Sequence, residues 1–576
     1  MIREQGPNMT RSAMWFTVMV IVLMFTGDVS AQHLDRRVDN LETSWIGNSF
    51  AGGDRWVQNS IFKMQVQPDG TVYTWSGWDE AGRRYGIYKD GDVIGNEDKG
   101  IETDRVTVAG HTWYIVDYEE RRQYRRWGTG VAREGSDLEL EDVVMPTGLG
   151  IDRVNDLLMV ADDGIGQRVV KFYDPETGEL VRTFGVPGGI YPSEVGGDPS
   201  QDGVIESDLQ FWDLTGTGTD DQGNIYVAMS EEGQSGSSIR VFNHEGDELL
   251  WEVHSHLFTD VGGFEPGTDG KIVRGMQERY VIDYDQPPGQ QYTRVGYSQN
   301  SNRDRDDWRQ GGLGAAMFRK VDGRLFMFQN TQGNRLTYYR FDRQSHGEIA
   351  IPVRPLYDLV ERGARTNFHI TGNADVWKAY GSTITGYRCR GVNDDGELEW
   401  DEPVTFGKPE AFGHLLTVNY AGGESDTMYV GGFPPGEQPH GWWHVGSLLA
   451  RYDNWHDEPE LVWSIELPYA HEERNVPDRV VNSVIVVEGD YVFVNYCIYN
   501  TDEPEIDTPG VINVYRKDDG SFVGEIFAGP EVHWQSSWHD IRPAFDVKQR
   551  ANGEYVILSE ENWKAKTLLF RWRPED

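Results

Sequence analysis

Two short segments place tryptophan beside histidine, a combination that could bind a ligand or move a proton. One, in a Pro/Gly-rich stretch, holds His440, Trp442, Trp443 and His444, and the other holds His533, Trp534, Trp538, His539 and Asp540. Exposed aromatic side chains often mark a partner site, and histidine titrates near neutral pH. We expect the tryptophans and His440 to bind a ligand, with His444, His533, His539 and Asp540 as candidate acid–base residues. Packing of one tryptophan is the alternative, because adjacent strand positions face opposite sides.

A third segment combines an aromatic ring with charged groups. It holds Trp78, Asp79, Glu80 and Arg83. Sugars stack on flat rings and form hydrogen bonds with carboxylates and guanidinium groups, so we expect this segment to bind a ligand. The alternative is a structural turn in which the Asp side chain accepts backbone N–H groups.

Other histidines carry weaker signals. Ser536 and Ser537 stand near His539 and Asp540, but a Ser-His-Asp triad is defined by geometry, and the sequence shows no nucleophile elbow or oxyanion-hole motif. His369, His414 and His471 fall at expected strand ends or loops, and we interpret them as structural.

The loop at 198–208 has oxygen-bearing side chains at a spacing that suits Ca²⁺. The candidate ligands are Asp198, Ser200, Asp202, Glu206 and Asp208. The first three, followed by Gly203, match the start of an EF-hand loop. Leu209 stands where that motif has its last carboxylate, so the match is partial. An ordinary acidic turn is the alternative.

The overall charge limits the partners. The chain of 576 residues has 53 Lys and Arg against 94 Asp and Glu, a net charge of −41. Such a surface repels the phosphates of nucleic acids and anionic membranes, so neither is an expected partner. The charge is compatible with bound Ca²⁺, and simple solubility also accounts for it.

The N-terminus resembles a secretory signal peptide over residues 1–31. Arg11 precedes an apolar run at 13–25, and small residues at 29–31 suit cleavage. The run is short for a bilayer span, so we expect a secreted or periplasmic protein without stable membrane insertion after cleavage. An uncleaved anchor is the alternative. Cys389 and Cys497 permit a disulfide in that compartment but do not require one.

A unit of four short apolar runs, separated by Asp/Gly turns, recurs along the chain. The clearest copies span 64–94, 149–184, 216–253 and 484–527. Alternation with a period of two predicts strands, and the turns predict hairpins. Units of this kind, repeated every 40 to 65 residues or roughly so, predict the blades of a β-propeller.

We therefore predict an all-β fold, a closed β-propeller of four-stranded blades numbering about eight, within a range of roughly seven to nine. The ring is expected to occupy 56–576 after a leading segment at 32–55, with loop insertions near 187–210, 256–312 and 433–446. One blade buries little apolar surface, so blades must pack on their neighbours, and ring closure protects the end sheets.

Three segments carry a resemblance to a known family: PDGTVYTWSG at 68–77, PTGLGIDRVNDLLMVADD at 146–163 and LTGTGTDDQGNIYVAM at 214–229. They look like NHL-repeat propellers, and in particular like large secreted bacterial propellers without an assigned activity. The resemblance covers most of the chain and implies the fold. Such rings host binding modules, lyases and lactonases, so the resemblance leaves the activity open.

The motifs of nucleotide, dinucleotide and zinc chemistry are missing from the sequence. We expect an extracellular glycan, or another neutral polymer, held by aromatic and carboxylate loops on one face. A carbohydrate-active enzyme of the polysaccharide lyase or lactone hydrolase type, with His and Asp at the mouth of the axis, is the first alternative. A protein-interaction scaffold is the second. The sequence leaves the oligomeric state open.

Overall fold

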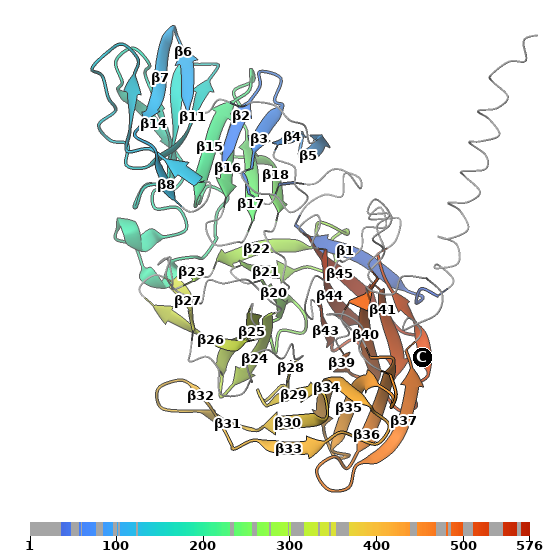
Figure 1. Ribbon diagram of the computed structural model, residues 1–576. Coiled ribbons are helices and arrows are strands. Elements are labelled where there is room, and N and C mark those ends of the chain that lie inside the picture. The colour runs from blue at the N-terminus through green and yellow to red at the C-terminus, as the bar shows by residue number, and fades with distance from the viewer. Residues whose placement is uncertain are drawn as a thin grey trace, which may run out of the picture.

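The computed structural model is built almost entirely of antiparallel strands (Figure 1). It describes residues 36–47, 57–58, 60–76, 85–95, 101, 104–121, 125–230, 236–255, 262–275, 278–297, 299–300, 316–331, 335–344, 347–352, 368–437, 446–467, 480–481, 485–498, 511–528, 545–561 and 566–575. Within these ranges the helical elements are two short 3₁₀ helices, η2 (Pro192–Val195) and η3 (Pro199–Gln201). No helix of the described chain is long and apolar enough to cross a membrane. The predicted all-β fold of four-stranded antiparallel sheets is confirmed.

Six sheets, built from residues 263–572 together with β1, surround one centre, and we call them the six-sheet ring. Their strands are β19 (Gly263–Phe264), β20 (Ile272–Arg274), β21 (Glu278–Ile282) and β22 (Tyr292–Tyr297); β23 (Gln299–Asn300), β24 (Ala316–Val321), β25 (Arg324–Thr331), β26 (Arg335–Gln344) and β27 (Gly347–Pro352); β28 (Phe368–Ile370), β29 (Val376–Tyr380), β30 (Thr383–Tyr387) and β33 (Val404–Gly407); β34 (His414–Gly422), β35 (Thr427–Phe433), β36 (Leu448–Asp453) and β37 (Glu460–Glu466); β38 (Val480–Val481), β39 (Ile485–Glu488), β40 (Tyr491–Ile498), β41 (Val511–Arg516) and β42 (Phe522–Ile526); and β43 (Phe545–Gln549), β44 (Tyr555–Glu561) and β45 (Lys566–Trp572) with β1 (Leu41–Ile46). A small hairpin of β31 (Cys389–Val392) and β32 (Leu398–Trp400) extends from the third sheet.

Each sheet of this ring packs a face on the next, and the order of contacts returns to the first sheet. Buried apolar clusters join successive sheets through the pairs Phe326 and Phe368, Trp377 and Val430, Tyr429 and Val492, Phe493 and Phe570, and Leu558 and Tyr280. Between the first two sheets, the Arg274 guanidinium lies over the Phe341 ring, 4.9 Å from its centroid. Large side chains between twisted sheets supply most of the burial, which is why the aromatic content is high.

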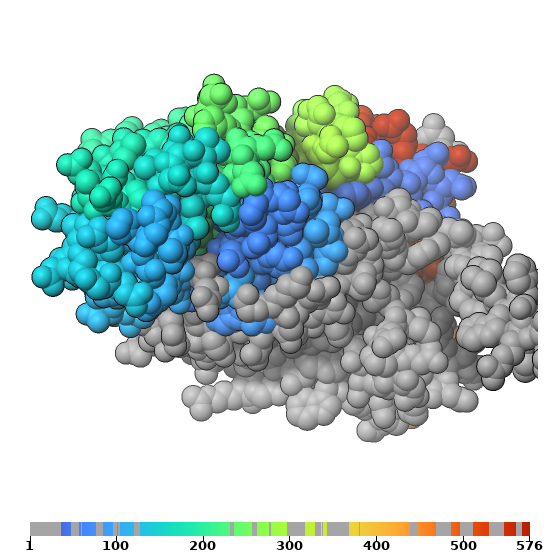
Figure 2. Space-filling model, turned by 90° about the horizontal axis from the view of Figure 1, so that it is seen from above, coloured from blue at the N-terminus to red at the C-terminus, as the bar shows by residue number. Residues whose placement is uncertain are grey.

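Strand β1 completes the last sheet of the ring, although more than 500 residues separate it from its partner. It pairs antiparallel with β45 from Leu41 opposite Trp572 to Ile46 opposite Thr567. Ile46 is 1% exposed and belongs to the apolar cluster between the last and first sheets. Figure 2 shows blue residues of the N-terminal region beside red residues of the C-terminal end. The two ends of the folded chain thus belong to one sheet.

Four sheets between β1 and the ring form a second group, the four-sheet unit. Its strands are β2 (Lys63–Val66), β3 (Val72–Trp75), β4 (Tyr85–Lys89) and β5 (Asp92–Gly95); β6 (Arg105–Val108), β7 (His111–Val116) and β10 (Gly130–Arg133); β11 (Pro146–Asp152), β12 (Leu157–Asp162), β13 (Val169–Tyr173) and β14 (Leu180–Phe184); and β15 (Leu214–Thr219), β16 (Ile225–Ser230), β17 (Ser237–Phe242) and β18 (Leu249–Ser255), with a separate pair of β8 (Glu119–Arg121) and β9 (Arg125–Trp127). Figure 1 shows these blue and green sheets gathered at one end of the molecule.

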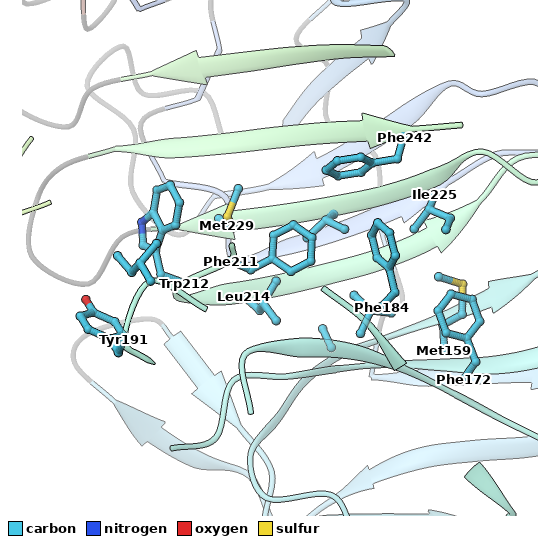
Figure 3. Packing of buried hydrophobic residues seen from close by; sticks show 14 residues of the cluster. Met159, Phe172, Phe184, Tyr191, Phe211, Trp212, Leu214, Ile225, Met229 and Phe242 are labelled. Atoms are coloured by element: carbon cyan, nitrogen blue, oxygen red, sulfur yellow. The ribbon is translucent and has the colours of Figure 1, made fainter. Parts of the chain in front are cut away.

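Aromatic packing holds the four-sheet unit together. Between its third and fourth sheets, Phe184 meets Phe242 edge to face with ring centroids 5.2 Å apart, and Phe211 packs on both (Figure 3). The first strands of these two sheets approach closely: a Cβ atom on Gly150 would lie 2.2 Å from the carbonyl oxygen of Thr217. Only glycine fits such an approach.

Local turn chemistry explains why the sheets are built of hairpins. Between β13 and β14, the Asp174 carboxylate accepts hydrogen bonds from the backbone N–H groups of Glu176 and Thr177. Gly178 then takes a φ of +75°, a region that other residues rarely adopt. Asp and Gly at these two places fix the hairpin and its register.

The two groups of sheets meet at a buried cluster of charges. Arg294 of β22 and Glu252 of β18 form an ion pair of 2.9 Å, and Glu278 lies 3.3 Å from His254. Burial alone would raise the pKa of Glu252, but Arg240 and Arg294 hold it below its usual range. The 187–210 segment, predicted as an insertion, also reaches this junction, because Val204 forms a β-bridge with Gly296.

The grouping of the sheets differs from the expected arrangement of about eight blades in one ring. Six sheets share one centre, and the other four pack among themselves. Both groups use the same local pattern of strands and turns, so that pattern does not specify which sheets share an axis.

Replacing Ile46 with Ala tests the contribution of β1 to the ring. The substitution removes a buried side chain between two sheets, so the free energy of unfolding should fall by about 2–5 kcal/mol. Val181→Ala is the matched control, because Val181 is a strand residue of the four-sheet unit that is 55% exposed. Its effect should stay within about 0.5 kcal/mol. Equal effects in chemical denaturation would contradict the assigned role of β1.

Candidate functional site

A pocket of about 1150 Å³ occupies the centre of the six-sheet ring. One strand of every sheet, β19, β24, β28, β34, β39 or β43, contributes to its wall, through residues such as Phe264, Arg319, His369, Asn419, Glu488 and Asp546. We call these six the first strands of the ring. The volume lies slightly above the usual range of ligand sites, roughly 300–1,000 Å³. The pocket is the candidate functional site.

Charged groups of both signs line this pocket in near balance. The cations are Arg319, Lys320, Arg388, Lys517 and Lys548, and the anions are Glu265, Asp375, Asp401, Glu402, Glu488 and Asp546. The whole chain, by contrast, has 94 acidic side chains against 53 basic ones. The pocket wall is therefore far less acidic than the protein as a whole.

Arg319, on β24, is fixed by backbone carbonyl groups rather than by carboxylates. Its Nε donates to the carbonyl oxygens of Ile370 at 3.0 Å and Thr371 at 2.9 Å, Nη2 donates to Ile370 at 2.7 Å, and Nη1 to Phe318 at 2.7 Å. Burial lowers the pKa of this guanidinium, and the more distant Asp546 and Glu488 partly offset that shift. These bonds join β24 to the start of the third sheet and hold a positive charge in the pocket wall.

Asp546, on β43, is held by backbone donors. Its Oδ2 accepts from the N–H of Phe264 at 2.8 Å, and its Oδ1 accepts from its neighbour Val547 at 3.0 Å. Burial raises the pKa of this carboxyl group, although Arg319 and the two N–H groups oppose the rise. The bond to Phe264 connects the last sheet of the ring to the first.

His369, on β28, stays neutral. Burial and the Arg319 charge lower its pKa to about 3, despite a contact of 3.2 Å between Nε2 and the carbonyl oxygen of Tyr420. A histidine with this pKa is a weak base at neutral pH. It serves as a fixed hydrogen-bonding group between the third and fourth sheets.

Aromatic rings form one side of the pocket. The ring centroids of Trp377 and Tyr420 lie 4.6 Å apart, and the His456 ring lies 5.7 Å from Trp377 and 5.5 Å from Tyr420. All three residues line the pocket. The indole N–H of Trp377 is buried without a hydrogen-bond partner among the described residues. Trp377 is 4% exposed and packs behind the other two rings, so Tyr420 and His456 supply the accessible aromatic surface.

Asp426 anchors two members of this aromatic group. Its Oδ1 accepts a hydrogen bond of 2.8 Å from the Tyr420 hydroxyl and lies 2.8 Å from Nδ1 of His456, and its Oδ2 accepts from the His456 backbone N–H at 2.7 Å. Burial would raise the pKa of Asp426, but the bonds from His456 and Tyr420 lower it. Burial and Asp426 together raise the pKa of Tyr420, so its hydroxyl keeps its proton.

The aromatic and histidine segments predicted to bind lie outside the described residues. This holds for Trp78, Asp79, Glu80 and Arg83, for His440, Trp442, Trp443 and His444, and for His533, Trp534, Trp538, His539 and Asp540. Their roles stay predictions. Of the histidines interpreted as structural, His369 lines the pocket, His414 does not, and His471 is outside the described residues.

Sequence reasoning did not find the pocket residues. Arg319, Tyr420 and Asp546 come from three strands spread over more than 200 residues, and each looks like an ordinary polar position in an alternating run. The sequence signal that could have identified them is a polar residue at a buried position of the strand nearest the axis. Using that signal requires knowing which strand of each sheet faces the axis.

The proposed calcium ligands are described, and two of them satisfy nearby backbone groups. Asp198 is exposed and accepts from the Ser200 N–H at 2.9 Å, whereas Asp202 is 3% exposed and accepts from both the N–H and the hydroxyl of Ser193. No group of three or more His, Cys, Asp or Glu that could hold a metal occurs in the described part of the chain. The Ca²⁺ site stays a prediction.

Comparisons with known proteins add no family to this picture. No protein-family model and no curated protein matches the chain. Similar solved structures include a fucose-specific lectin from Aleuria aurantia, with a TM-score of 0.30, 11% identity, and coverage of 60% of this chain and 90% of the lectin. The Dos1 propeller has a TM-score of 0.21 and 10% identity, covering 81% of this chain and 92% of its own. A putative 6-phosphogluconolactonase from Bacteroides fragilis has a TM-score of 0.23 and 12% identity, covering 75% and 97%. Such low scores carry no argument about function, which must come from the pocket.

Replacing Asp202 with Ala separates a structural role from a calcium-binding one. The substitution leaves the Ser193 N–H without its acceptor, so the free energy of unfolding should fall by roughly 1–3 kcal/mol. That loss should be the same with Ca²⁺ and with a chelator if Asp202 only orders the loop. A melting temperature that falls on chelation in the wild type but not in the variant would instead support the Ca²⁺ site.

Replacing His369 with Gln tests the buried neutral histidine. The unfolded chain takes up this proton near pH 6.5 and the folded protein only near pH 3, so stability is lost as the pH falls between these values. The variant should lose this dependence, which amounts to at most about 1.4 kcal/mol per pH unit. Denaturation midpoints between roughly pH 6.5 and 5, above the range of most carboxylates, provide the measurement. If the denaturation midpoints of the wild type and of His369→Gln change in parallel with pH, the lowered pKa of His369 is contradicted.

Proposed function

We propose that the protein is an exported saccharide-binding protein whose binding site is the central pocket of the six-sheet ring. The observation that carries the proposal is the composition of the wall: hydrogen-bonding groups of both signs facing an aromatic side. Sugars need this combination, because their hydroxyl groups require donors and acceptors while their C–H faces pack on flat rings. Export rests on the signal-like segment at 1–31.

The protonation states in the pocket favour binding over catalysis. A general base for sugar chemistry needs a pKa near the working pH. His369, with a pKa of about 3, is too weakly basic, and the raised pKa of Tyr420 opposes its use as a base. These two residues supply fixed hydrogen bonds instead of proton transfer.

One feature favours an enzyme as the second candidate. Asp426 lies 2.8 Å from Nδ1 of His456, whose side chain is 43% exposed and lines the pocket. A carboxylate on Nδ1 fixes the tautomer that leaves Nε2 able to accept a proton. A lyase or lactone hydrolase could use such a group, in keeping with the alternative that the sequence left open.

Replacing His456 with Ala tests the pocket directly. The affinity for an oligosaccharide found on a glycan array should fall by at least about 1 kcal/mol, because the ring is part of the aromatic side. His111→Ala, in the four-sheet unit, is the matched control and should bind normally. Trp443→Ala and Trp534→Ala test the loop segments predicted to bind. A loss confined to these two variants would overturn the pocket assignment.

The same assay separates the two candidate functions. Binding without any change in the sugar supports a binding protein. Release of an unsaturated or ring-opened product that stops in His456→Asn would assign an enzyme.

A further inference from the structure

The wall of the pocket contains positive charges that form no ion pair with a carboxylate in the described part of the chain. Arg319 forms no ion pair with any residue in the described ranges, and the same is true of Lys320 and Arg388. Lys548 differs, because it is paired with Glu488. Arg319 is the informative case, because its half-buried guanidinium has lost much of its hydration without gaining a counter-ion.

The hydrogen bonds of Arg319 leave part of its donor capacity unused. A guanidinium has five N–H groups. The bonds to Phe318, Ile370 and Thr371 use Nε and one N–H on each terminal nitrogen, so one N–H on Nη1 and one on Nη2 have no acceptor among the described residues. Guanidinium groups bind carboxylates through such paired donors. The four bonds to carbonyl oxygens hold the side chain in place before a ligand arrives.

The nearest anion of the pocket does not fill this role. Asp546 is close enough to affect the pKa of Arg319 but forms no ion pair with it, and its two oxygens accept backbone N–H groups. Lys320, the next residue along β24, is exposed and lines the same pocket. Its side chain leaves the strand on the face opposite to Arg319. A second cation in the same pocket strengthens the long-range attraction for an anionic group.

From this geometry we infer that the pocket selects an acidic saccharide, a uronic acid, whose carboxylate binds Arg319 with support from Lys320. The inference rests on the proposed saccharide-binding function and replaces the neutral glycan expected from the net charge. The sugar ring packs on Tyr420 and His456, which Trp377 supports from behind. The carboxylate supplies the counter-ion that Arg319 lacks among the described residues.

Matched sugars test this inference on the full mature protein. Calorimetry compares trimers of galacturonate, mannuronate and glucuronate with their methyl esters, which keep the shape of the sugar and remove the charge. At least one acid should bind at least about tenfold more tightly than its ester, as expected for charge-assisted hydrogen bonds. Added salt should reduce that ratio.

Variants assign the selectivity to named residues. Arg319→Gln should abolish the preference for the acid, and Arg319→Lys should restore only part of it, because lysine lacks the paired donors. Lys320→Gln should weaken acid binding roughly threefold without changing the melting temperature. Lys89→Gln, in the four-sheet unit, is the matched control and should bind like the wild type. If Arg319→Gln does not fold, two other measurements still test the inference. They are the comparison of acid with ester in the wild type and the acid binding of Lys320→Gln.

Four outcomes overturn the inference, and one of them also overturns the proposed function. Equal binding of acid and ester, or selectivity that survives in both Arg319→Gln and Lys320→Gln, contradicts an acidic ligand at Arg319. Binding of neutral sugars alone leaves the proposed function standing and removes only the inference. Binding of no saccharide, acidic or neutral, removes both.

Discussion

The pairing of β1 with β45 is the constraint on which the ring depends. Six residue pairs join Leu41–Ile46 to the last strand of the chain, and Ile46 fills the interface between the last sheet and the first. Without this strand, the sixth sheet would have an exposed edge and an incomplete face. The four-sheet unit lies between β1 and the ring in sequence, so a long segment must fold while the two ends of the ring find each other. Contacts of such sequence separation carry a high entropic cost of chain closure.

The number of sheets around its centre explains why the six-sheet ring encloses a pocket. In the four-sheet unit, first strands touch directly: Cβ atoms on Gly148 and Gly150 would lie 2.8 Å and 2.2 Å from the carbonyl oxygens of Thr215 and Thr217. Glycine is required there because no side chain fits between the strands. With six sheets the first strands stand farther from the axis, and side chains such as Arg319 and Asp546 line a space between them. Polar groups can then face a ligand while apolar faces pack between the sheets.

The sequence predicted the local structure well because hairpins are encoded locally. The copy at 149–184 corresponds to β11–β14, and the copy at 216–253 corresponds to β15–β18, each with its Asp/Gly turns. The grouping of sheets was not predictable, since it depends on how faces of similar composition pack. The pocket was missed for the same reason: Arg319 and His369 lie on different sheets, and only the ring brings them together. The aromatic residues of the loops were predicted to bind a ligand because they depart from the alternating strand pattern, whereas the pocket residues follow that pattern.

A net charge of −41 does not prevent an acidic ligand from binding in the pocket. The charges on the outer surface and the groups of the pocket wall act on the ligand over different distances. Charges on the outer surface are screened over roughly 10 Å in ordinary salt, whereas groups in a pocket with low-dielectric walls interact more strongly. At the pocket, the near balance of cations and anions removes most of the local repulsion. Burial makes Asp546 easier to protonate, and Glu488 is paired with Lys548, so the two anions that act on Arg319 are both weakened. The surface charge keeps the protein soluble and slows the approach of polyanions, and the contacts at Arg319 decide which anion stays.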